Sequence, residues 1–326
     1  MIGVLGGGAW GTALANAIAA GGEDVLVWAR EAEVVAAINT AHENSPFLPG
    51  ITLDHRVRAT GHAADLTQCD VWLVVTPAQH LRAVLANSPV AAGVSLILCA
   101  KGIEAGSHLL MSEVARAVAP GCPLAVLSGP TFAHEVAAGL PTAVTLACED
   151  QAVGELLAAR IARPALRPYL SDDVIGAEIG GAVKNVLAIG CGVVIGAGLG
   201  ENARAAIIAR GFAEMTRFGI ARGAHAETMA GLSGLGDLVL TCGSTASRNM
   251  SFGVGLGQGR TAAELLANRS NVAEGVFTAP VLAEDAAARG VDMPIAAAVA
   301  ALIAGQTSVS DTISALLARP LRTERG

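Results

Sequence analysis

The chain has 326 residues, of which 52% are hydrophobic and 15% are charged, and its formal net charge is -7. Single cores stop growing near ~250 residues, so this length predicts two domains. The negative charge argues against a nucleic acid as the main partner, because an acidic surface repels phosphate groups.

The six cysteines form no C-x-x-C pair, and the seven histidines show no H-x-x-x-H or H-E-x-x-H spacing. We therefore expect reduced thiols in the core of a cytoplasmic protein, and no metal site. The first residues already read as a strand, which leaves no room for a signal peptide. Two apolar runs are candidates for a membrane span. The uncharged run 186–200 is shorter than the ~20 residues that a span needs, and the run 293–310 contains a proline and polar residues. No membrane insertion is therefore expected.

The strongest motif begins at the second residue. Residues 2–5 read as a buried strand, and Gly6, Gly8 and Gly11 follow with the G-x-G-x-x-G spacing that opens a helix to about residue 20. Gly6 permits the tight turn, Gly8 lets backbone N–H groups approach a pyrophosphate, and Gly11 lets helix and strand pack closely. A second strand, 24–28, completes the pattern, so we predict a dinucleotide site rather than a plain turn.

The end of that second strand bears on the choice of nucleotide. An acidic residue there would bind the ribose 2'-hydroxyl of NAD, but this chain has Ala29-Arg30, with Glu31 just beyond. An arginine pairs with a 2'-phosphate, so NADP is favoured and NAD remains possible. The alternative is that Arg30 is a solvated loop residue.

Strands and helices alternate as far as about residue 170. We expect an open, parallel sheet whose further strands cover 57–60, 70–78, 94–100, 124–127, 141–147 and 167–170, with helices over 31–40 and 80–86. Functional loops of such a sheet follow the carboxyl ends of its strands. Lys101 stands at one of these ends, either as a cation for the substrate or nicotinamide end or as a charged turn residue.

Strand signals disappear after residue 171, and the rest of the chain reads as successive helices. These are expected over 173–197, 202–219, 225–230, 248–254, 261–268, 278–289 and 294–304. The change predicts a domain boundary between 1–171 and 172–326. The tail 319–326 is expected to be frayed.

The first helix of the second domain carries a lysine in apolar surroundings. Lys184 lies among small and apolar residues, with Gly180 and Gly181 on the turn before it, so another group can approach this side of the helix closely. Burial lowers the pKa of a lysine, as a general acid or base near neutral pH requires. We predict that Lys184 exchanges a proton with a secondary alcohol during hydride transfer, the alternative being a lysine whose stem covers apolar surface.

An aspartate later in the chain is a candidate partner for this lysine. Asp237 follows the glycine-rich turn 231–236 and begins an apolar run. It is either a helix N-cap or a carboxylate that orients the ammonium of Lys184 or binds substrate hydroxyls.

A group suited to phosphate follows at a predicted helix start. Ser247, Arg248 and Asn249 combine a guanidinium, side-chain donors and free backbone N–H groups. The alternative is an N-cap serine followed by a solvated arginine. Glu274 places a carboxylate in a turn before a helix, which is a weak signal by itself.

Taken together, nine segments resemble the NAD(P)-dependent glycerol-3-phosphate dehydrogenases of bacteria. They follow one another over nearly the whole chain, and the last four are far more specific than the glycine turn. The resemblance implies an α/β Rossmann-type N-terminal domain and an all-helical C-terminal domain, as in the 6-phosphogluconate dehydrogenase-like fold. The segments are GGGAWGTALA (6–15), VVTPAQ (74–79), AKGIE (100–104), LSGPTFAHEVAAGLPTAV (127–144), AVKNVLAIG (182–190), GENARAAIIARGFAEM (200–215), GLSGLGDLVLTC (231–242), SRN (247–249) and VAEGVFTA (272–279).

The resemblance also implies roles for individual residues. Lys184 would be the proton acceptor in alcohol oxidation, with Asp237 as its partner. The substrate, dihydroxyacetone phosphate or sn-glycerol 3-phosphate, would be bound by Lys101, Gly129, Thr131, Lys184, Asp237, Ser247, Arg248 and Asn249. Besides the turn glycines Gly6, Gly8 and Gly11 predicted above, the nucleotide would contact Trp10, Arg30, Lys101, Ala133, Arg248, Val272 and Glu274.

This family supplies glycerol 3-phosphate for phospholipid synthesis, and we expect a cytoplasmic homodimer. Two other interpretations stay open. A β-hydroxyacid dehydrogenase shares the two-domain plan and a lysine-asparagine pair, but acts on a carboxylate substrate without phosphate. A non-catalytic NADP(H)-sensing module would keep the fold alone, and the presence of both Lys184 and the 247–249 cluster argues against it.

Overall fold

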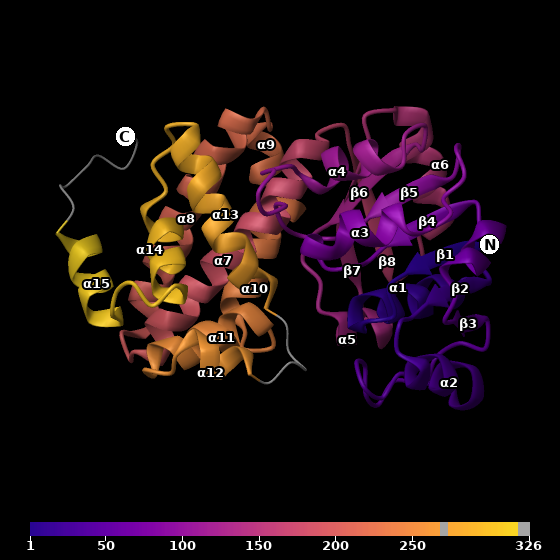
Figure 1. Cartoon of the computed structure of the whole chain (residues 1–326), viewed down its shortest axis with the longest axis horizontal. Helices are drawn as coiled ribbons and strands as arrows, with labels where there is room; N and C mark the ends of the chain where they lie inside the picture. Colours follow the sequence, from indigo (N-terminus) through magenta and orange to yellow (C-terminus); the bar gives the residue numbers. More distant parts are fainter. Residues whose placement is uncertain (268–272, 319–326) are drawn as a thin grey trace.

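The computed structural model describes residues 1–267 and 273–318. An α/β domain and a helical domain lie side by side along the longest axis of the molecule (Figure 1). The α/β domain is built on one eight-stranded sheet of order β3-β2-β1-β4-β5-β6-β7-β8. Its strands are β1 (Ile2–Leu5), β2 (Val25–Trp28), β3 (Val57–Thr60), β4 (Val71–Val74), β5 (Ser95–Leu98), β6 (Leu124–Ser128), β7 (Thr142–Ala147) and β8 (Leu166–Ser171).

All eight predicted strands are present, although several are shorter than expected. The expectation of a parallel sheet holds for β1 to β6 and is wrong for the last two strands, because β7 pairs antiparallel with β6, and β8 is parallel to β7. The connection explains this reversal. Helix α5 (Ala133–Ala137) has five residues, about 7 Å, which is too short to return the chain to the far end of the sheet.

Helices cover both faces of the sheet, as the alternating pattern requires. The sequence located α1, α2 and α3 but not α4, α5 and α6. Besides α5, these helices are α1 (Ala9–Ala19), α2 (Ala32–Ala41), α3 (Leu81–Ala86), α4 (Met111–Val118) and α6 (Gln151–Ile161), with short 3-10 turns at η1 (Ala63–Gln68) and η2 (Ala78–His80).

The helical domain surrounds one long central helix, α7 (Val174–Gly196). The other elements are α8 (Gly200–Arg222), α9 (Ala226–Met229), the π-helical turn η3 (Leu232–Gly236), α10 (Asp237–Gly243), α11 (Arg248–Gly257), α12 (Ala262–Leu266), α13 (Glu274–Ala288), α14 (Pro294–Ile303) and α15 (Val309–Leu317). The last strand ends at Ser171 and α7 begins at Val174, which is where the sequence changes character. The boundary between 1–171 and 172–326 stays a prediction, and the tail 319–326 lies outside the described residues.

Helix α7 begins where the side chain of Asp173 accepts a hydrogen bond from the N–H of Gly176, an N-cap of the kind that aspartate favours. Small residues then let α11 approach it closely. A Cβ atom added to Gly192 or Gly196 of α7, or to Gly253 or Gly257 of α11, would collide with backbone atoms of the opposite helix. We call these four residues the glycine seam, and it fixes the spacing of the two helices with backbone atoms alone.

Helix α7 is also the one helix in the described part of the chain that is long and apolar enough to cross a membrane. Of the most apolar stretch, 89% is buried inside the structure. That is the pattern of a core helix, whose all-round apolar surface is covered by its neighbours.

Candidate active site

The turn between β1 and α1 has the geometry that the glycine spacing predicts. Gly6 has φ of +136°, a left-handed value that glycine adopts without strain. A side chain added at Gly8, the N-cap of α1, would meet open space, so the first N–H groups of this helix are accessible to an anion. Two buried polar atoms near this edge, Nε1 of Trp10 and Oγ1 of Thr76, have no hydrogen-bond partner within the described residues. The turn therefore fits a dinucleotide.

A lysine, an aspartate and a threonine from the helical domain form the centre of the site. Lys184 on α7 is buried, and its Nζ donates to Oδ1 of Asp237 at 2.9 Å and to Oγ1 of Thr241 at 2.8 Å. Thr241 in turn donates to Oδ1 of Asp237 at 3.1 Å. Asp237 is the first residue of α10 and not its N-cap, which is Gly236. Its carboxylate is therefore free to bind the lysine.

The N-terminal domain contributes a second ammonium group to the same carboxylate. Nζ of Lys101 donates to Oδ2 of Asp237 at 2.6 Å and to the carbonyl of Gly129 at 3.2 Å. A Cβ added to Gly181 would lie 3.2 Å from Cγ of Lys101, so the small residue on α7 makes room for the lysine stem. Two positive side chains from different domains thus share one buried carboxylate at the domain junction.

The pKa values of Lys184 and Asp237 are set by burial and by the charges that these two residues and Lys101 exert on one another. Burial lowers the pKa of Lys184 to about 8, and the nearby Lys101 ammonium adds to this, while Asp237 opposes it. Burial alone would raise the pKa of Asp237, but the ammonium groups of Lys101 and Lys184 outweigh it and hold that pKa below its usual value. Lys184 is therefore able to give up or accept a proton near neutral pH.

Hydrogen bonds of two asparagine side chains lie beside Lys184 and Asp237. Nδ2 of Asn249 donates to Oδ1 of Asn185 at 2.8 Å, and the N–H of Gly275 donates to Oδ1 of Asn249 at 2.9 Å. Glu274, the residue before Gly275, accepts from the N–H of Ala78 at 3.2 Å. Removal from water raises the pKa of Glu274, and the positive charges of Arg248 and Lys101 oppose this rise. These contacts bring the 247–249 and 274 segments to the junction.

The remaining predicted residues lie as follows. Ser247 is the N-cap of α11 and accepts from the N–H of Met250, and Arg248 is exposed beside it, as the simpler interpretation of this pair expects. Thr131 follows β6 and donates to the carbonyl of Gly129 at 3.4 Å, and Ala133 begins α5. Their contacts with substrate or nucleotide stay predictions.

Arg30 has a side chain that is 84% exposed, and it pairs with Oε1 of Glu31 at 2.8 Å. It is thus accessible at the end of β2, where a 2'-phosphate would bind. Val272 lies outside the described residues, so its predicted contact with the nucleotide is untested.

Sequence reasoning missed two residues of the site, Thr241 and Asn185. Thr241 is four residues after Asp237 on α10, and residues at this spacing face the same side of a helix. That spacing is the signal that would have identified it. Asn185 directly follows Lys184 and bonds to Asn249, a pairing between distant segments that no local pattern reveals.

A glycine turn on a Rossmann-type sheet, joined to a helical domain that supplies a buried lysine, defines a nucleotide-dependent dehydrogenase of the two-domain type. Family models place the chain within this class. The model for the NAD-dependent glycerol-3-phosphate dehydrogenase N-terminus matches residues 1–154, and that for the C-terminus matches residues 173–314. The chain belongs to the NAD-dependent glycerol-3-phosphate dehydrogenase family.

Individual relatives agree with this placement. A glycerol-3-phosphate dehydrogenase [NAD(P)+] from Erythrobacter litoralis is 63% identical over 99% of this chain and 97% of its own length. A second glycerol-3-phosphate dehydrogenase [NAD(P)+], from Sphingopyxis alaskensis, is 61% identical over 99% of this chain and 97% of its own length. Among solved structures, glycerol-3-phosphate dehydrogenase from Coxiella burnetii shares 36% identity and superposes with a TM-score of 0.93, covering 98% of each chain.

Proposed function

We propose that this chain reduces dihydroxyacetone phosphate to sn-glycerol 3-phosphate, with NADPH or NADH as reductant. The observation that supports this best is the buried Lys184, whose ammonium is held by Asp237 and Thr241 beside a second ammonium from the other domain. A bound reduced nicotinamide supplies the hydride. The chain's own residues supply the proton and the positions of the reacting groups.

In this mechanism Lys184 donates a proton from Nζ to the C2 oxygen of the substrate as that oxygen gains negative charge. Its neutral amine then recovers a proton from water, and oxidation of the alcohol follows the reverse path. Asp237 keeps the ammonium oriented, and the Lys101 ammonium adds positive charge where the oxyanion develops. The N-terminus of α11, with Ser247, Arg248 and Asn249, would hold the phosphate.

One assay tests the proposal directly. The purified protein, mixed with dihydroxyacetone phosphate and NADPH or NADH, should oxidise the nucleotide, which is followed at the nicotinamide absorbance. A parallel assay with small hydroxy acids and their keto forms, which carry no phosphate, tests the alternative of a β-hydroxyacid dehydrogenase. Nucleotide binding with no oxidation in any arm would favour a sensing module and remove the proposal.

Arg248 offers a prediction about substrate binding. Arg248→Ala should raise the KM for dihydroxyacetone phosphate roughly 10- to 100-fold, since a charge-assisted bond to phosphate is lost, while kcat changes less. Steady-state kinetics measures both constants. The matched control is Arg260→Ala, another exposed arginine of the same domain, which should leave the KM unchanged. An unchanged KM in Arg248→Ala would move the phosphate site elsewhere.

Arg30 offers a prediction about the nucleotide. Arg30→Ala should lower the ratio of kcat/KM for NADPH to that for NADH about tenfold, because the guanidinium that faces the 2'-phosphate is removed. Kinetics with each nucleotide in turn gives this ratio. The control is Arg116→Ala, which removes an exposed arginine from α4. If the two variants had the same ratio of kcat/KM for NADPH to that for NADH, the predicted preference for NADP would be contradicted.

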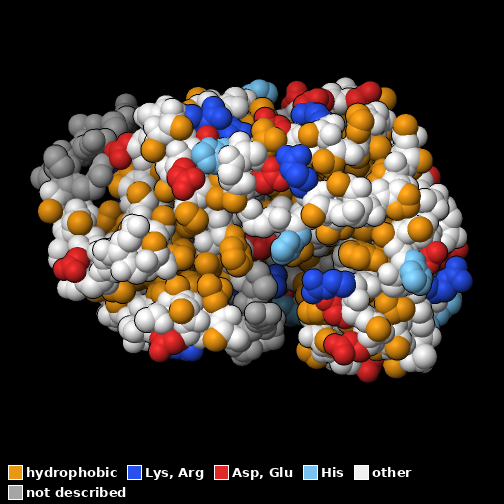
Figure 2. Space-filling view, in the orientation of Figure 1, with side chains coloured by type: hydrophobic (Ala, Val, Ile, Leu, Met, Phe, Trp, Pro, Cys, Tyr) orange, Lys and Arg blue, Asp and Glu red, His pale blue; other side chains and the backbone are white. Residues whose placement is uncertain are grey.

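We further infer that the enzyme works as a cytoplasmic homodimer and feeds phospholipid synthesis. Hydrophobic side chains gather over the helical domain on the face shown in Figure 2, and Ile220, Val239 and Phe277 of this domain are about half exposed. An apolar surface of this kind supports contact with a second copy. Sedimentation equilibrium tests it, with a monomer at micromolar concentration as the contrary result.

A further inference from the structure

The segment between β5 and α4 belongs to the N-terminal domain by its place in the chain but packs into the helical domain. Ile103 and Leu110 pair as an antiparallel bridge. Their side chains are 0% and 1% exposed, and both lie in the hydrophobic cluster that contains Phe218 of α8. We call residues 103–110 the docking hairpin. Its two apolar ends anchor one domain in the core of the other.

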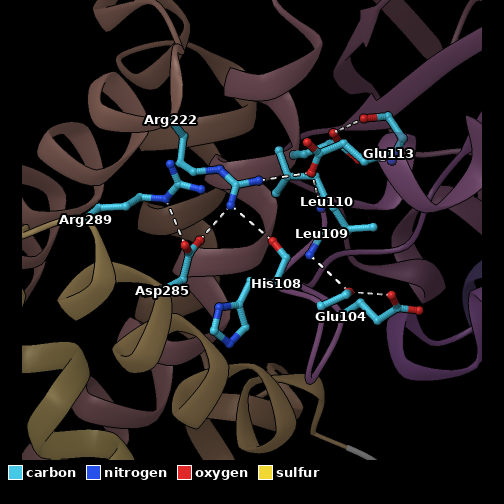
Figure 3. Close-up of polar contacts among 11 residues, drawn as sticks. Glu104, His108, Leu109, Leu110, Glu113, Arg222, Asp285 and Arg289 are labelled. Atoms are coloured by element: carbon cyan, nitrogen blue, oxygen red, sulfur yellow. Dashed lines mark hydrogen bonds and ion pairs between the residues drawn. The ribbon is translucent and has the colours of Figure 1, made fainter.

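A buried arginine of the helical domain binds the tip of this hairpin (Figure 3). Nη1 of Arg222, at the end of α8, donates to the carbonyl of His108 at 3.1 Å and to Oδ2 of Asp285 at 2.7 Å. Its Nη2 donates to Oε2 of Glu113 at 3.0 Å. The side chain of Arg222 is 6% exposed and that of Asp285 is 3% exposed. One guanidinium thus joins α8, α13, the hairpin and α4, a task suited to its fork of donors.

The residue that Arg222 holds has an uncommon backbone conformation. His108 has φ of 58°, in the left-handed region that residues other than glycine seldom adopt. The turn is closed by bonds from the N–H of His108 to the carbonyl of Glu104 and from the N–H of Glu104 to the carbonyl of Leu109. A conformation of this kind persists when surrounding contacts enforce it, and Arg222 supplies one at the strained residue itself.

Contacts along the segment connect the hairpin to the active site. Lys101 lies two residues before the hairpin and bonds to Asp237. Gln79 holds the first residues of the hairpin, because its Nε2 donates to the carbonyl of Ile103 at 2.8 Å and its Oε1 accepts from the N–H of Ala105 at 3.0 Å. A shift of the hairpin would therefore move Lys101 relative to the carboxylate that it shares with Lys184.

The far end of the segment is also fixed to the helix that carries Lys184. Glu178 of α7 is buried and accepts from the N–H of Ser112 at 2.7 Å and from its Oγ at 2.6 Å. Residues 101–113 are thus fixed at both ends and at the hairpin tip. These three anchors lie on the helical domain, while Gln79 and Arg82 hold the hairpin from the N-terminal domain, Arg82 by donating to both carboxylate oxygens of Glu104. The segment therefore links the two domains.

We propose that Arg222 is a positioning residue for the reaction. By holding the docking hairpin against the helical domain, it fixes Lys101 and, through Lys101, the carboxylate of Asp237. This inference rests on the proposed function.

A double-mutant cycle tests the proposal. Arg222→Met should lower kcat/KM for dihydroxyacetone phosphate about tenfold in the wild-type background, and by less than twofold when Lys101 is already alanine, because residues that act through one another are not additive. An equal fold loss in both backgrounds would show a general structural effect and overturn the proposal, as would no loss in the wild-type background.

Arg289→Met is the matched control. Nε of Arg289 donates to the other oxygen of Asp285, Oδ1, at 2.8 Å. The contacts with His108 and Glu113 are made by Arg222, so the loss of Arg289 should change kcat/KM by less than twofold. Should Arg222→Met not fold, Arg222→Lys takes its place. A lysine keeps the charge beside Asp285 but loses the fork that reaches His108 and Glu113, so the same non-additive loss is expected.

Hydrogen exchange gives a readout that needs no activity. The amides of Glu104 and His108 should exchange at least tenfold faster in Arg222→Met than in the wild type or in Arg289→Met, because their bonds close the hairpin turn. Equal exchange in all three proteins would overturn the proposal. A wild-type protein that does not reduce dihydroxyacetone phosphate would remove the proposed function instead, and the exchange rates would still decide whether Arg222 holds the hairpin.

Discussion

Replacing Lys184 with methionine should lower kcat for dihydroxyacetone phosphate reduction by about 10²- to 10⁴-fold, the usual contribution of a general acid. Methionine fills a similar volume, and Asp237 keeps its bond to Lys101, so the carboxylate is not left unpaired. Nucleotide binding should be largely retained, because the glycine turn lies on the other domain. Steady-state kinetics and NADPH fluorescence titration measure the two effects.

The pH profile adds a test of the same residue. Because the pKa of Lys184 is about 8, reduction should slow as the pH rises through 8, where the ammonium is lost. Alcohol oxidation needs the neutral amine and should accelerate over the same range. Measuring kcat/KM in each direction from pH 6 to 10 shows the expected fall in reduction and the expected rise in oxidation.

Lys184→Arg is the control that separates charge from proton transfer. Arginine keeps the positive charge but does not release a proton in this pH range, so this variant should be nearly as impaired as Lys184→Met. Turnover close to that of the wild type in either variant would remove Lys184 as the proton donor. A strong loss of NADPH binding in both would assign the residue to the nucleotide site instead.

Replacing Asp237 with asparagine should reduce kcat/KM roughly 10²-fold or more, since one carboxylate offsets the repulsion between two buried ammonium groups. Asp237 also favours the charged form of Lys184, through both its charge and its hydrogen bond. Its loss should lower the pKa of Lys184 further below 8. The falling limb of the reduction profile should therefore move to lower pH, which kinetics from pH 5 to 9 would detect.

Asp70→Asn is the matched control for this change. Asp70 directly precedes β4 and pairs with Arg160 on the surface, so its loss should leave both the rate and the profile unchanged. An Asp237→Asn enzyme with a wild-type profile would mean that the carboxylate does not control Lys184.

The parts of the site that sequence could predict are those with local signals. The glycine turn, the lysine among small residues and the aspartate after a glycine-rich turn each differ from what a core helix or strand needs. Sequence placed Lys184 and Asp237 as partners 53 residues apart, and the structure joins them at 2.9 Å. The strand and helix pattern fixed the fold class for the same reason, because periodicity is local.

The parts that sequence missed depend on contacts between distant segments. Nothing in residues 103–110 shows that Ile103 and Leu110 pack into the core of the other domain, since a buried apolar residue looks the same in either core. Arg222 likewise lies three residues beyond the end of the helix predicted over 202–219, and nothing in the local sequence distinguishes it from any basic residue near a helix C-terminus. The reversal of β7 depended on the short length of α5, which the sequence did not locate.

The glycine seam between α7 and α11 has a consequence for how the enzyme can move and vary. Along the seam the two helices meet through main-chain atoms, with no side chains there to repack, so neither can slide or rotate against the other without steric overlap. Lys184 on α7 and the Ser247-Arg248-Asn249 group at the start of α11 therefore travel as one rigid unit. Any opening of the enzyme to admit substrate has to take place elsewhere, and evolution can retune the surrounding loops while the proposed proton donor and the proposed phosphate site keep a constant separation.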